Sequence, residues 1–356
     1  MIAAEAVPYA LAFREPYVTA RGRLERREMV LLRVRTDEGA EGLGEAVAMS
    51  LRGGQGAQAL AREITEVGAP RLVGAEPDSS SEAVDAVTGG MSAPARAAVE
   101  IALLDLAAKR AGQPLWRHLG AESLDPVPCN ATLVAGTPPA VAADAEGWAE
   151  RGFRTFKLKV GVPGDVGQVE AVRAAVGSQA RLRVDANGVW SPQEAVLRLT
   201  AMERHGLELA EQPAADLEDL AAVRNQTAIP IAADESVNAP ADARRATELG
   251  ACQLATVKLA KVGGIVSARA IAAELPVYLS SALDGPIGIA AAAHLAQVLR
   301  PAAPWADLAH GLATQLLFSD TIASVQCDLR GNRLHLPEGA GLGVEIDEAA
   351  LERCRL

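Results

Sequence analysis

Five charged residues recur at a nearly constant spacing in the middle of the chain. Each stands at the end of a strand-like run, 23 to 26 residues from the next: Lys159, Asp185, Glu211, Asp234 and Lys258. One strand and its following helix occupy about this length in a barrel of alternating strands and helices, and the carboxyl ends of such strands meet at one mouth. We therefore predict that a base, three acids and a second base converge there.

This set of side chains indicates proton transfer assisted by a metal ion. Three converging carboxylates repel one another unless protons or a cation neutralise them. Because the set lacks histidine and cysteine, it favours a hard divalent ion, and we predict that Asp185, Glu211 and Asp234 bind Mg²⁺, with Mn²⁺ as a substitute. Such an ion makes a substrate carboxylate a better electron sink, so that its α-proton is easier to remove. Lys159 and Lys258 would then reach the substrate carbon from its two faces.

The strand that carries the first base reads RTFKLKVG at positions 154 to 161. Phe156 and Leu158 fall on one face, whereas Lys157 and Lys159 fall on the other. Since both faces of a parallel sheet are normally buried, the two lysines are expected at the mouth beside the carboxylates. Burial and a neighbouring cation both lower a lysine pKa, so we expect Lys157 to lower the pKa of Lys159.

The single members of the set have simpler explanations. Any one acid fits a structural salt bridge, and Asp234, which precedes Glu235 and Ser236, fits a helix cap. The regular spacing of all five residues is not explained in this way.

Eight strand-like runs alternate with helical patterns from VPCNATL at 127–133 to DLAHGL at 307–312. This alternation predicts an α/β protein with a modified TIM-type (β/α)7β barrel over residues 121–324. Residues 1–120 predict an α+β capping domain, which the tail at 325–356 rejoins.

The capping domain is expected to begin with antiparallel strands and continue with alanine-rich helices, most firmly at 95–110. The three expected strands are Tyr9–Phe13, Met29–Arg35 and Leu43–Ala48. Mobile loops are expected near 20–28, which is basic, and near 50–56, which is rich in glycine.

Composition narrows the classes of function. The 356 residues are 49% hydrophobic and 22% charged, as in globular proteins. A net charge of -11 argues against nucleic acid and anionic membranes as partners, and no obligate protein partner is indicated. The chain lacks an apolar run of about 18 residues and a signal peptide pattern. Its four cysteines form no CxxC pair, which indicates reduced thiols in a cytoplasmic protein.

At these residues the sequence resembles the enolase superfamily, specifically its muconate-lactonizing subgroup, over essentially the whole chain. The matching segments are KLK at 157–159, DANGVW at 185–190, EQP at 211–213, ADES at 233–236 and VKLAKVGG at 257–264. The resemblance implies the metal ligands and acid/base lysines named above, and it suggests that Asn187 and Glu235 orient the metal site. Lys261 adds a cation to which the pattern assigns no role.

Within the subgroup the sequence is most similar to actinobacterial-type o-succinylbenzoate synthases. The segments are CNATL at 129–133, SSALDGPIGIAAAAHL at 280–295 and HGLAT at 310–314. The implied reaction, in menaquinone biosynthesis, dehydrates 2-succinyl-6-hydroxy-2,4-cyclohexadiene-1-carboxylate to 2-succinylbenzoate through an enediolate. The substrate is a small dicarboxylate. Its second carboxylate would meet Ser280 or Ser281, with Arg21 and Arg23 closing over the mouth.

Other functions remain open on the same residues. N-acylamino acid racemases and dipeptide epimerases would use both lysines as opposed acid and base. A dipeptide epimerase is expected to carry an acidic pair near the eighth strand's end, and HGLATQLLFSD has none before Asp320. A Schiff-base aldolase has no use for three carboxylates, and a non-catalytic binding protein would be expected to have lost at least one of the five groups.

Overall fold

An antiparallel sheet opens the chain in the computed structural model, which describes residues 1–50, 53–76, 79–299 and 301–356. Its strands pair in sequence order: β1 (Ala3–Thr19), β2 (Gly22–Arg35) and β3 (Glu41–Val47). Both faces of this sheet are buried, because Val30 and Leu32 of β2 face a cap cluster whereas Met29 and Leu31 face the larger core shared with the barrel.

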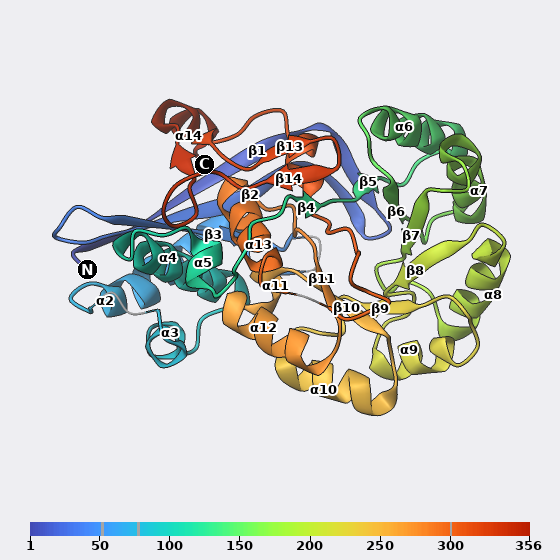
Figure 1. Ribbon diagram of the computed structural model, residues 1–356, viewed down its shortest axis with the longest axis horizontal. Coiled ribbons are helices and arrows are strands. Elements are labelled where there is room, and N and C mark those ends of the chain that lie inside the picture. Colours follow the sequence, from blue (N-terminus) through green and yellow to red (C-terminus); the bar gives the residue numbers. More distant parts are fainter. Residues whose placement is uncertain (51–52, 77–78, 300) are drawn as a thin grey trace.

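Helices cover the outer face of the sheet (Figure 1). They are α1 (Ala57–Glu63), the π-helical turn η2 (Ile64–Gly68), α2 (Ala69–Leu72), α3 (Ser81–Thr88) and α4 (Ala93–Arg110). The short helix α5 (Leu115–His118) follows α4, and its Leu115 belongs to the larger core. Helix α4 lies directly on β3, where a Cβ added at Gly44 would stand 1.9 Å from the Ala98 carbonyl oxygen. Glycine is therefore required at this crossing.

The expected loop at 20–28 is wrong, because most of it belongs to a β-hairpin. Only Ala20 and Arg21 form the turn, and β2 then pairs with β1 from Gly22 onward, with Arg27 opposite Leu11. The first residues of β2 are charged and largely exposed, so they lack the apolar alternation by which a strand is recognised in a sequence. Of the other expected loop, residues 51 and 52 lie outside the described residues.

In the described part of the chain, seven parallel strands form the barrel wall, in sequence order around the sheet. They are β5 (Ala131–Leu133), β6 (Thr155–Lys159), β7 (Arg181–Asp185), β8 (Leu207–Glu211), β9 (Ile231–Ala233), β10 (Leu254–Val257) and β11 (Val277–Leu279). The connecting helices lie outside them (Figure 1): α6 (Pro138–Glu150), α7 (Asp165–Val176), α8 (Pro192–Glu203), α9 (Leu217–Arg224), α10 (Pro240–Leu249), α11 (Leu259–Val262), α12 (Ile265–Glu274) and α13 (Pro286–Ala296). The predicted fold class is confirmed.

The first and the last strand of the barrel differ from the prediction. Among the described residues, the expected eighth strand makes only isolated parallel bridges, from His310 to Cys129 and from Gly311 to Ser280. These bridges nevertheless join the two edges of the sheet. The expected first strand is split, because its start, β4 (Val127–Pro128), pairs instead with the C-terminal strand β14 (Arg333–His335).

The C-terminal segment lies against the N-terminal sheet. It follows the 3-10 turn η3 (Ala313–Leu317) and comprises β12 (Ala323–Val325), β13 (Asp328–Arg330), β14, β15 (Glu345–Ile346) and α14 (Glu348–Cys354). Helix α14 packs near β1 (Figure 1), and the Leu356 amide donates to the Pro8 carbonyl at 3.1 Å. Both ends of the chain thus contribute to the cap.

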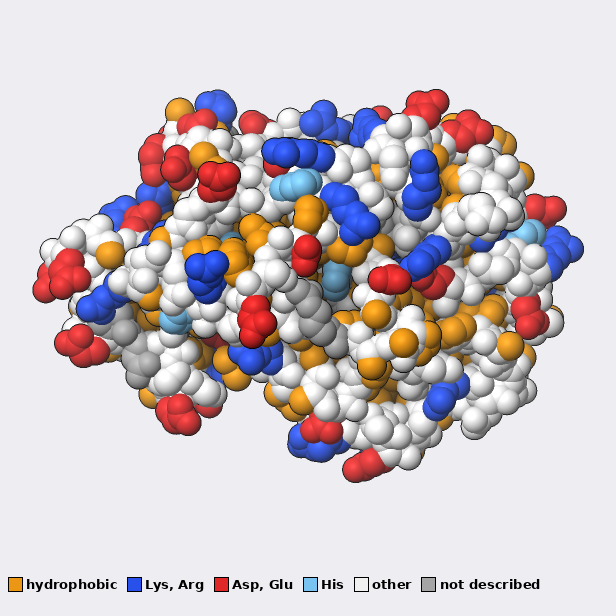
Figure 2. Space-filling model, in the orientation of Figure 1, with side chains coloured by type: hydrophobic (Ala, Val, Ile, Leu, Met, Phe, Trp, Pro, Cys, Tyr) orange, Lys and Arg blue, Asp and Glu red, His pale blue; other side chains and the backbone are white. Residues whose placement is uncertain are grey.

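The surface charge and the helices give two further observations. On the face seen in Figure 2, lysine and arginine side chains are dispersed among acidic ones, without a broad basic patch among the residues coloured there. Among the described helices, none combines the length and the apolarity that crossing a membrane requires.

Candidate active site

The barrel register brings the five charged residues to one mouth. Lys159 lies opposite Asp185 in the pairing of β6 with β7, and Asp185 lies opposite Glu211 in the pairing of β7 with β8. Asp234 directly follows β9, and Lys258 directly follows β10. The three carboxylates are fully buried, and each of the two lysines is only 6% exposed.

Lysine amines neutralise the carboxylates. The Lys157 Nζ atom lies 2.9 Å from Asp185 Oδ2 and 2.6 Å from Glu211 Oε2, while Lys159 Nζ lies 2.6 Å from Asp185 Oδ2. A second group surrounds Asp234. Lys258 Nζ lies 2.5 Å from its Oδ2 atom, and Lys261, to which the sequence pattern gave no role, lies 2.9 Å from its Oδ1 atom.

Burial and these ion pairs together shift the pKa values of Lys159 and Lys261. Burial, the largest influence, lowers the pKa of Lys159, but Asp185 and other anionic neighbours together raise it above its ordinary value. The expected effect of Lys157 exists as a smaller lowering, so the expectation of a net lowered pKa is wrong for this arrangement. The pKa of Lys261 is lowered, by burial first and also by Lys258, against the opposing effect of Asp234.

The acids fit a hard divalent ion in donor chemistry. Among the described residues, no three His, Cys, Asp or Glu side chains stand close enough together to hold a metal ion as they are placed, because lysines bridge the acids. Glu211 Oε1, however, is buried and has no hydrogen-bond partner within the described part of the chain. An unpaired buried carboxylate oxygen is costly, and a cation would satisfy it. Asp185, Glu211 and Asp234 are the groups that would hold Mg²⁺.

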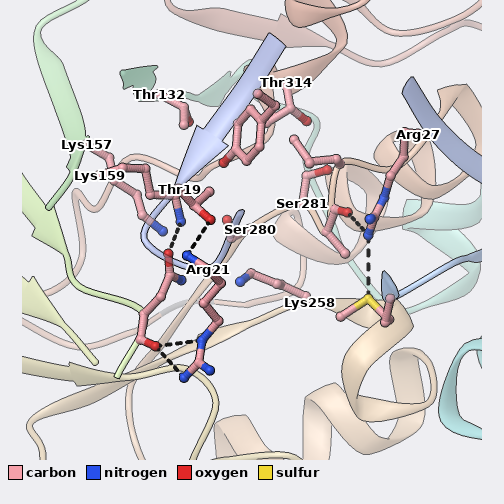
Figure 3. A pocket seen from close by; sticks show the side chains of 15 residues that line it. Thr19, Arg21, Arg27, Thr132, Lys157, Lys159, Lys258, Ser280, Ser281 and Thr314 are labelled. Atoms are coloured by element: carbon pink, nitrogen blue, oxygen red, sulfur yellow. Dashed lines mark hydrogen bonds between the residues drawn. The ribbon is translucent and has the colours of Figure 1, made fainter. Parts of the chain in front are cut away.

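A pocket opens above this cluster, between the barrel mouth and the tip of the β1–β2 hairpin (Figure 3). Lys159 and Lys258 extend into it from opposite sides of the view. Its lining combines cationic, hydroxyl and apolar side chains: Tyr17, Thr19, Arg21, Arg27, Met49, Thr132, Lys157, Lys159, Asn187, Lys258, Ser280, Ser281, Ala282, Leu283 and Thr314.

Arg21 attaches the hairpin tip to the barrel. Its Nε and Nη2 atoms donate to the Asn187 carbonyl at 2.9 and 2.7 Å. Asn187 itself takes the left-handed backbone conformation, with φ of 50°, and its backbone N–H donates to Asp185 Oδ1 at 2.9 Å. Its side chain accepts from Lys159 at 3.2 Å and donates to Glu235 at 3.2 Å. Asn187 therefore contacts Lys159 and Asp185 directly, and Glu235 contacts Asn187; that these two residues orient the metal site stays a prediction.

Of the basic residues on β2, Arg27 lines the pocket and Arg23 does not. Arg23, predicted to contact substrate, has a side chain that is 61% exposed and pairs with Glu25 at 2.8 Å. Arg27 is only 5% exposed, and its Nη2 atom donates to the Ala282 carbonyl at 2.6 Å. Sequence reasoning missed Arg27, although alternation along β2 puts it on the same face as buried Met29.

The two predicted serines after β11 also line the pocket, but they differ in their partners. The Ser281 hydroxyl donates to Asp284 Oδ2 at 2.8 Å and accepts from the Asp284 amide at 2.7 Å. Ser280 instead stands next to Gly311, where an added Cβ would lie 2.5 Å from its hydroxyl oxygen. Ser281 is thus engaged in shaping the loop.

Comparison with known families places both parts of the chain. Residues 1–120 match the family model described as the mandelate racemase / muconate lactonizing enzyme N-terminal domain. Residues 140–350 match the model described as enolase C-terminal domain-like. The two matches together span most of the chain.

Curated relatives differ in activity. The chain is 34% identical over 352 residues to the L-Ala-D/L-Glu epimerase of Bacillus subtilis, covering 94% of each. It is 29% identical to the N-succinyl-L-Arg/Lys racemase of Bacillus cereus, covering 96% of this chain and 94% of that one. It is 38% identical over 238 residues to the o-succinylbenzoate synthase of Thermobifida fusca, covering 64% and 73%.

Solved structures agree with these relationships. The substrate-liganded B. subtilis epimerase matches with a TM-score of 0.92 and 31% identity, covering 98% of this chain and 99% of that one. A dipeptide epimerase from Cytophaga hutchinsonii, complexed with Mg and the dipeptide D-Ala-L-Val, matches with a TM-score of 0.91 and 28% identity, covering 99% and 98%.

Proposed function

The chain belongs to the mandelate racemase and muconate lactonizing enzyme family of the enolase superfamily. From this premise we propose that it racemises N-acylated amino acids whose acyl group is anionic, such as N-succinylamino acids. The observation that carries this proposal is the charge of the pocket. Its lining contains five cationic side chains and, within the described residues, no aspartate or glutamate. A substrate with two carboxylates and a blocked amine suits such a lining.

The same charge pattern argues against a dipeptide as substrate, despite the similarity to dipeptide epimerases. A dipeptide carries a free ammonium group, which would be desolvated in this pocket without a carboxylate to pair with it. At the eighth-strand end, where an acidic pair would be expected, the chain has Ala313 and Thr314. The acylated amine of an N-succinylamino acid carries no charge and avoids this cost.

The two mouth lysines would exchange the α-proton. With Asp185 engaged by the metal, its raising effect on the pKa of Lys159 would be reduced. A neutral Lys159 would then take the proton from one face of the α-carbon onto Nζ, and a protonated Lys258 would return a proton from Nζ to the opposite face. The roles reverse for the other enantiomer. Bound Mg²⁺ would supply positive charge beside the substrate carboxylate and compete with the lysines for the acids. Asn187, which contacts both Lys159 and Asp185, would keep the base in place.

Arg27 is the group that we assign to the acyl carboxylate. Its guanidinium is buried and anchored on the Ala282 carbonyl, so its position costs little further ordering on binding. Ser280 and Thr314 line the same pocket and add hydroxyl donors. Arginine pairs with carboxylates through a planar fork, which gives both affinity and orientation.

Dehydration to o-succinylbenzoate is the second candidate, supported by the 38% identity to the T. fusca synthase. That substrate also combines a carboxylate next to an acidic proton with a succinyl group. Lys159 would remove the proton and, once protonated, assist the departure of hydroxide, while Lys258 stays cationic. Both candidates therefore place the same demands on Arg27.

Proton exchange at the α-carbon tests the proposal directly. Purified protein with Mg²⁺ is incubated in D₂O with an N-succinyl-L-amino acid, and the loss of the α-proton signal is followed by NMR beside the change in optical rotation. We expect exchange with inversion, and little exchange with an unblocked dipeptide. Rapid exchange of the dipeptide alone would refute the proposal, whereas ultraviolet detection of aromatisation with the cyclohexadiene substrate would select the second candidate.

Two arginine variants make the assignment of Arg27 specific. Arg27→Gln should raise KM for the succinylated substrate at least tenfold, because a charge-assisted pair is worth about 1.5–3 kcal/mol. Arg23→Gln, which removes an exposed arginine on the same strand, should leave KM within twofold. Equal effects of the two variants would contradict the assignment.

A further inference from the structure

A buried tyrosine stands directly behind one candidate metal ligand. Tyr278 belongs to β11, is fully buried, and donates its hydroxyl proton to Glu211 Oε2. The Lys157 amine reaches the same Oε2 atom at 2.6 Å. Glu211 is therefore held through one oxygen by two donors, while its Oε1 atom has no partner among the described residues.

The tyrosine is itself fixed from the interior of the barrel. The guanidinium carbon of Arg183 lies 4.8 Å from the centre of its ring. Arg183 is in turn held by Glu208 at 2.5 Å and by the Ala309 carbonyl at 2.7 Å. The ring also belongs to an apolar cluster inside the barrel with Leu209, Ala232, Leu254 and Leu308. Packing on these sides leaves the phenol hydroxyl little freedom to leave Glu211.

Lys157 alone would hold Glu211 less well, because its amine is shared. It lies 2.9 Å from Asp185 Oδ2 as well as 2.6 Å from Glu211 Oε2, so it can follow either carboxylate. The tyrosine hydroxyl has one proton, and Glu211 is the acceptor that the structure gives it. Groups that hydrogen-bond to a metal ligand fix its orientation and raise the affinity for the ion.

We propose that Tyr278 is a positioning residue for the divalent ion: by occupying Glu211 Oε2, it fixes the carboxylate so that Oε1 is left to bind the metal. This inference rests on the candidate metal site and on no property of the organic substrate. The proposal adds a residue of β11 itself to the site, to which Ser280 and Ser281, just after this strand, also belong.

Metal titration of substrate-free protein tests the role without turnover. Isothermal titration calorimetry with MgCl₂, repeated with MnCl₂, is carried out on the wild type and on Tyr278→Phe, which keeps the ring and removes only the hydroxyl. We expect the dissociation constant to rise roughly 10- to 100-fold. The matched control is Tyr9→Phe, since Tyr9 is also fully buried and donates at 2.8 Å to a glutamate, Glu45, in the cap. That variant should bind the metal as the wild type does.

A double-mutant cycle separates positioning from general destabilisation. Glu211→Gln should weaken metal binding, and adding Tyr278→Phe should weaken it little further, because the hydroxyl acts through the glutamate. Metal affinity of Tyr278→Phe within twofold of the wild type would overturn the inference, as would equal losses in the Tyr9→Phe control. Tyr278→Met, which also lacks the hydroxyl, provides the same comparison if the phenylalanine variant does not fold. Because no substrate is present, failure of the proposed racemisation leaves this result unaffected.

Discussion

A buried carboxyl at the junction of cap and barrel should make stability depend on pH. Glu45 lies on β3 and is 2% exposed. Its Oε2 atom accepts from the Tyr9 hydroxyl at 2.8 Å, and its Oε1 atom accepts from the Gly285 amide at 2.7 Å, just before α13. Burial, and then the nearby Asp284, raise the pKa of Glu45 from 4.5 to about 8. Glu45 is therefore protonated in the folded protein at neutral pH.

The sign and size of the effect follow from this pKa. Below pH 4.5 the carboxyl is protonated in both the folded and the unfolded state. As pH rises toward 8, the unfolded chain releases the proton and the folded protein must keep it, so folding stability falls. A difference of about 3.5 pH units corresponds to about 5 kcal/mol. With an unfolding entropy of about 2 cal/mol/K per residue, this lowers Tm by roughly 7 °C in a chain of 356 residues.

Thermal unfolding of the wild type and Glu45→Gln between pH 5 and 8.5 measures the effect. Glutamine keeps the shape of the side chain but does not titrate, so the wild-type Tm should fall relative to the variant as pH rises. His294 and His310, whose pKa values burial lowers to about 4, contribute stability of the opposite pH dependence, but they are present in both proteins and cancel. Parallel Tm profiles would show that Glu45 titrates normally and would refute the reasoning.

Three further predictions concern the mouth and the cap. Lys159→Ala and Lys258→Ala should each reduce racemisation roughly 10²- to 10⁴-fold. Each variant should retain α-deuterium exchange, measured by NMR, of only one enantiomer of the substrate. Exchange of both enantiomers by either variant would contradict two opposed bases. Chelation of the metal with EDTA should abolish turnover and leave the circular dichroism spectrum unchanged, because lysines already neutralise the acids; unfolding on chelation would contradict this. Gly44→Ala should destabilise the fold by about 1–3 kcal/mol, since its Cβ would stand 1.9 Å from the Ala98 carbonyl oxygen; an unchanged urea midpoint would show that α4 can move away.

The sequence predicted the mouth well because barrel periodicity is local. One strand and helix set the interval from Lys159 to Asp185, and β-strand alternation puts Lys157 on the same face as Lys159. These residues come together without any knowledge of packing. The expected magnesium site is consistent with this register, although the lysines now occupy the carboxylates.

The features that the sequence did not predict depend on contacts between distant segments. Arg27 faces the pocket because β2 already pairs with β1 there, opposite Leu11, in a strand that a run of charged residues concealed. Tyr278 reads as an apolar strand residue, and only closure of the barrel brings its hydroxyl to Glu211. The eighth strand was expected from an apolar pattern, but backbone pairing there is limited to His310 and Gly311. Pairing across a closed barrel is not a property of a sequence window.

The cap is better regarded as part of the active site than as a separate lid. Two of its buried carboxyl groups accept from backbone amides at the starts of barrel helices: Glu45 from Gly285 before α13, and Glu100 from Val266 in α12. Gly264 lets Glu100 approach, since a Cβ there would stand 2.4 Å from its Oε2 atom. Helices α12 and α13 follow the strand ends that carry the second lysine and the pocket serines. Movement of the whole cap would break both contacts and leave the two carboxyl groups without these hydrogen-bond donors, which costs free energy. Access for a substrate is therefore more easily provided by the hairpin tip, whose arginine rests on one backbone carbonyl at the mouth.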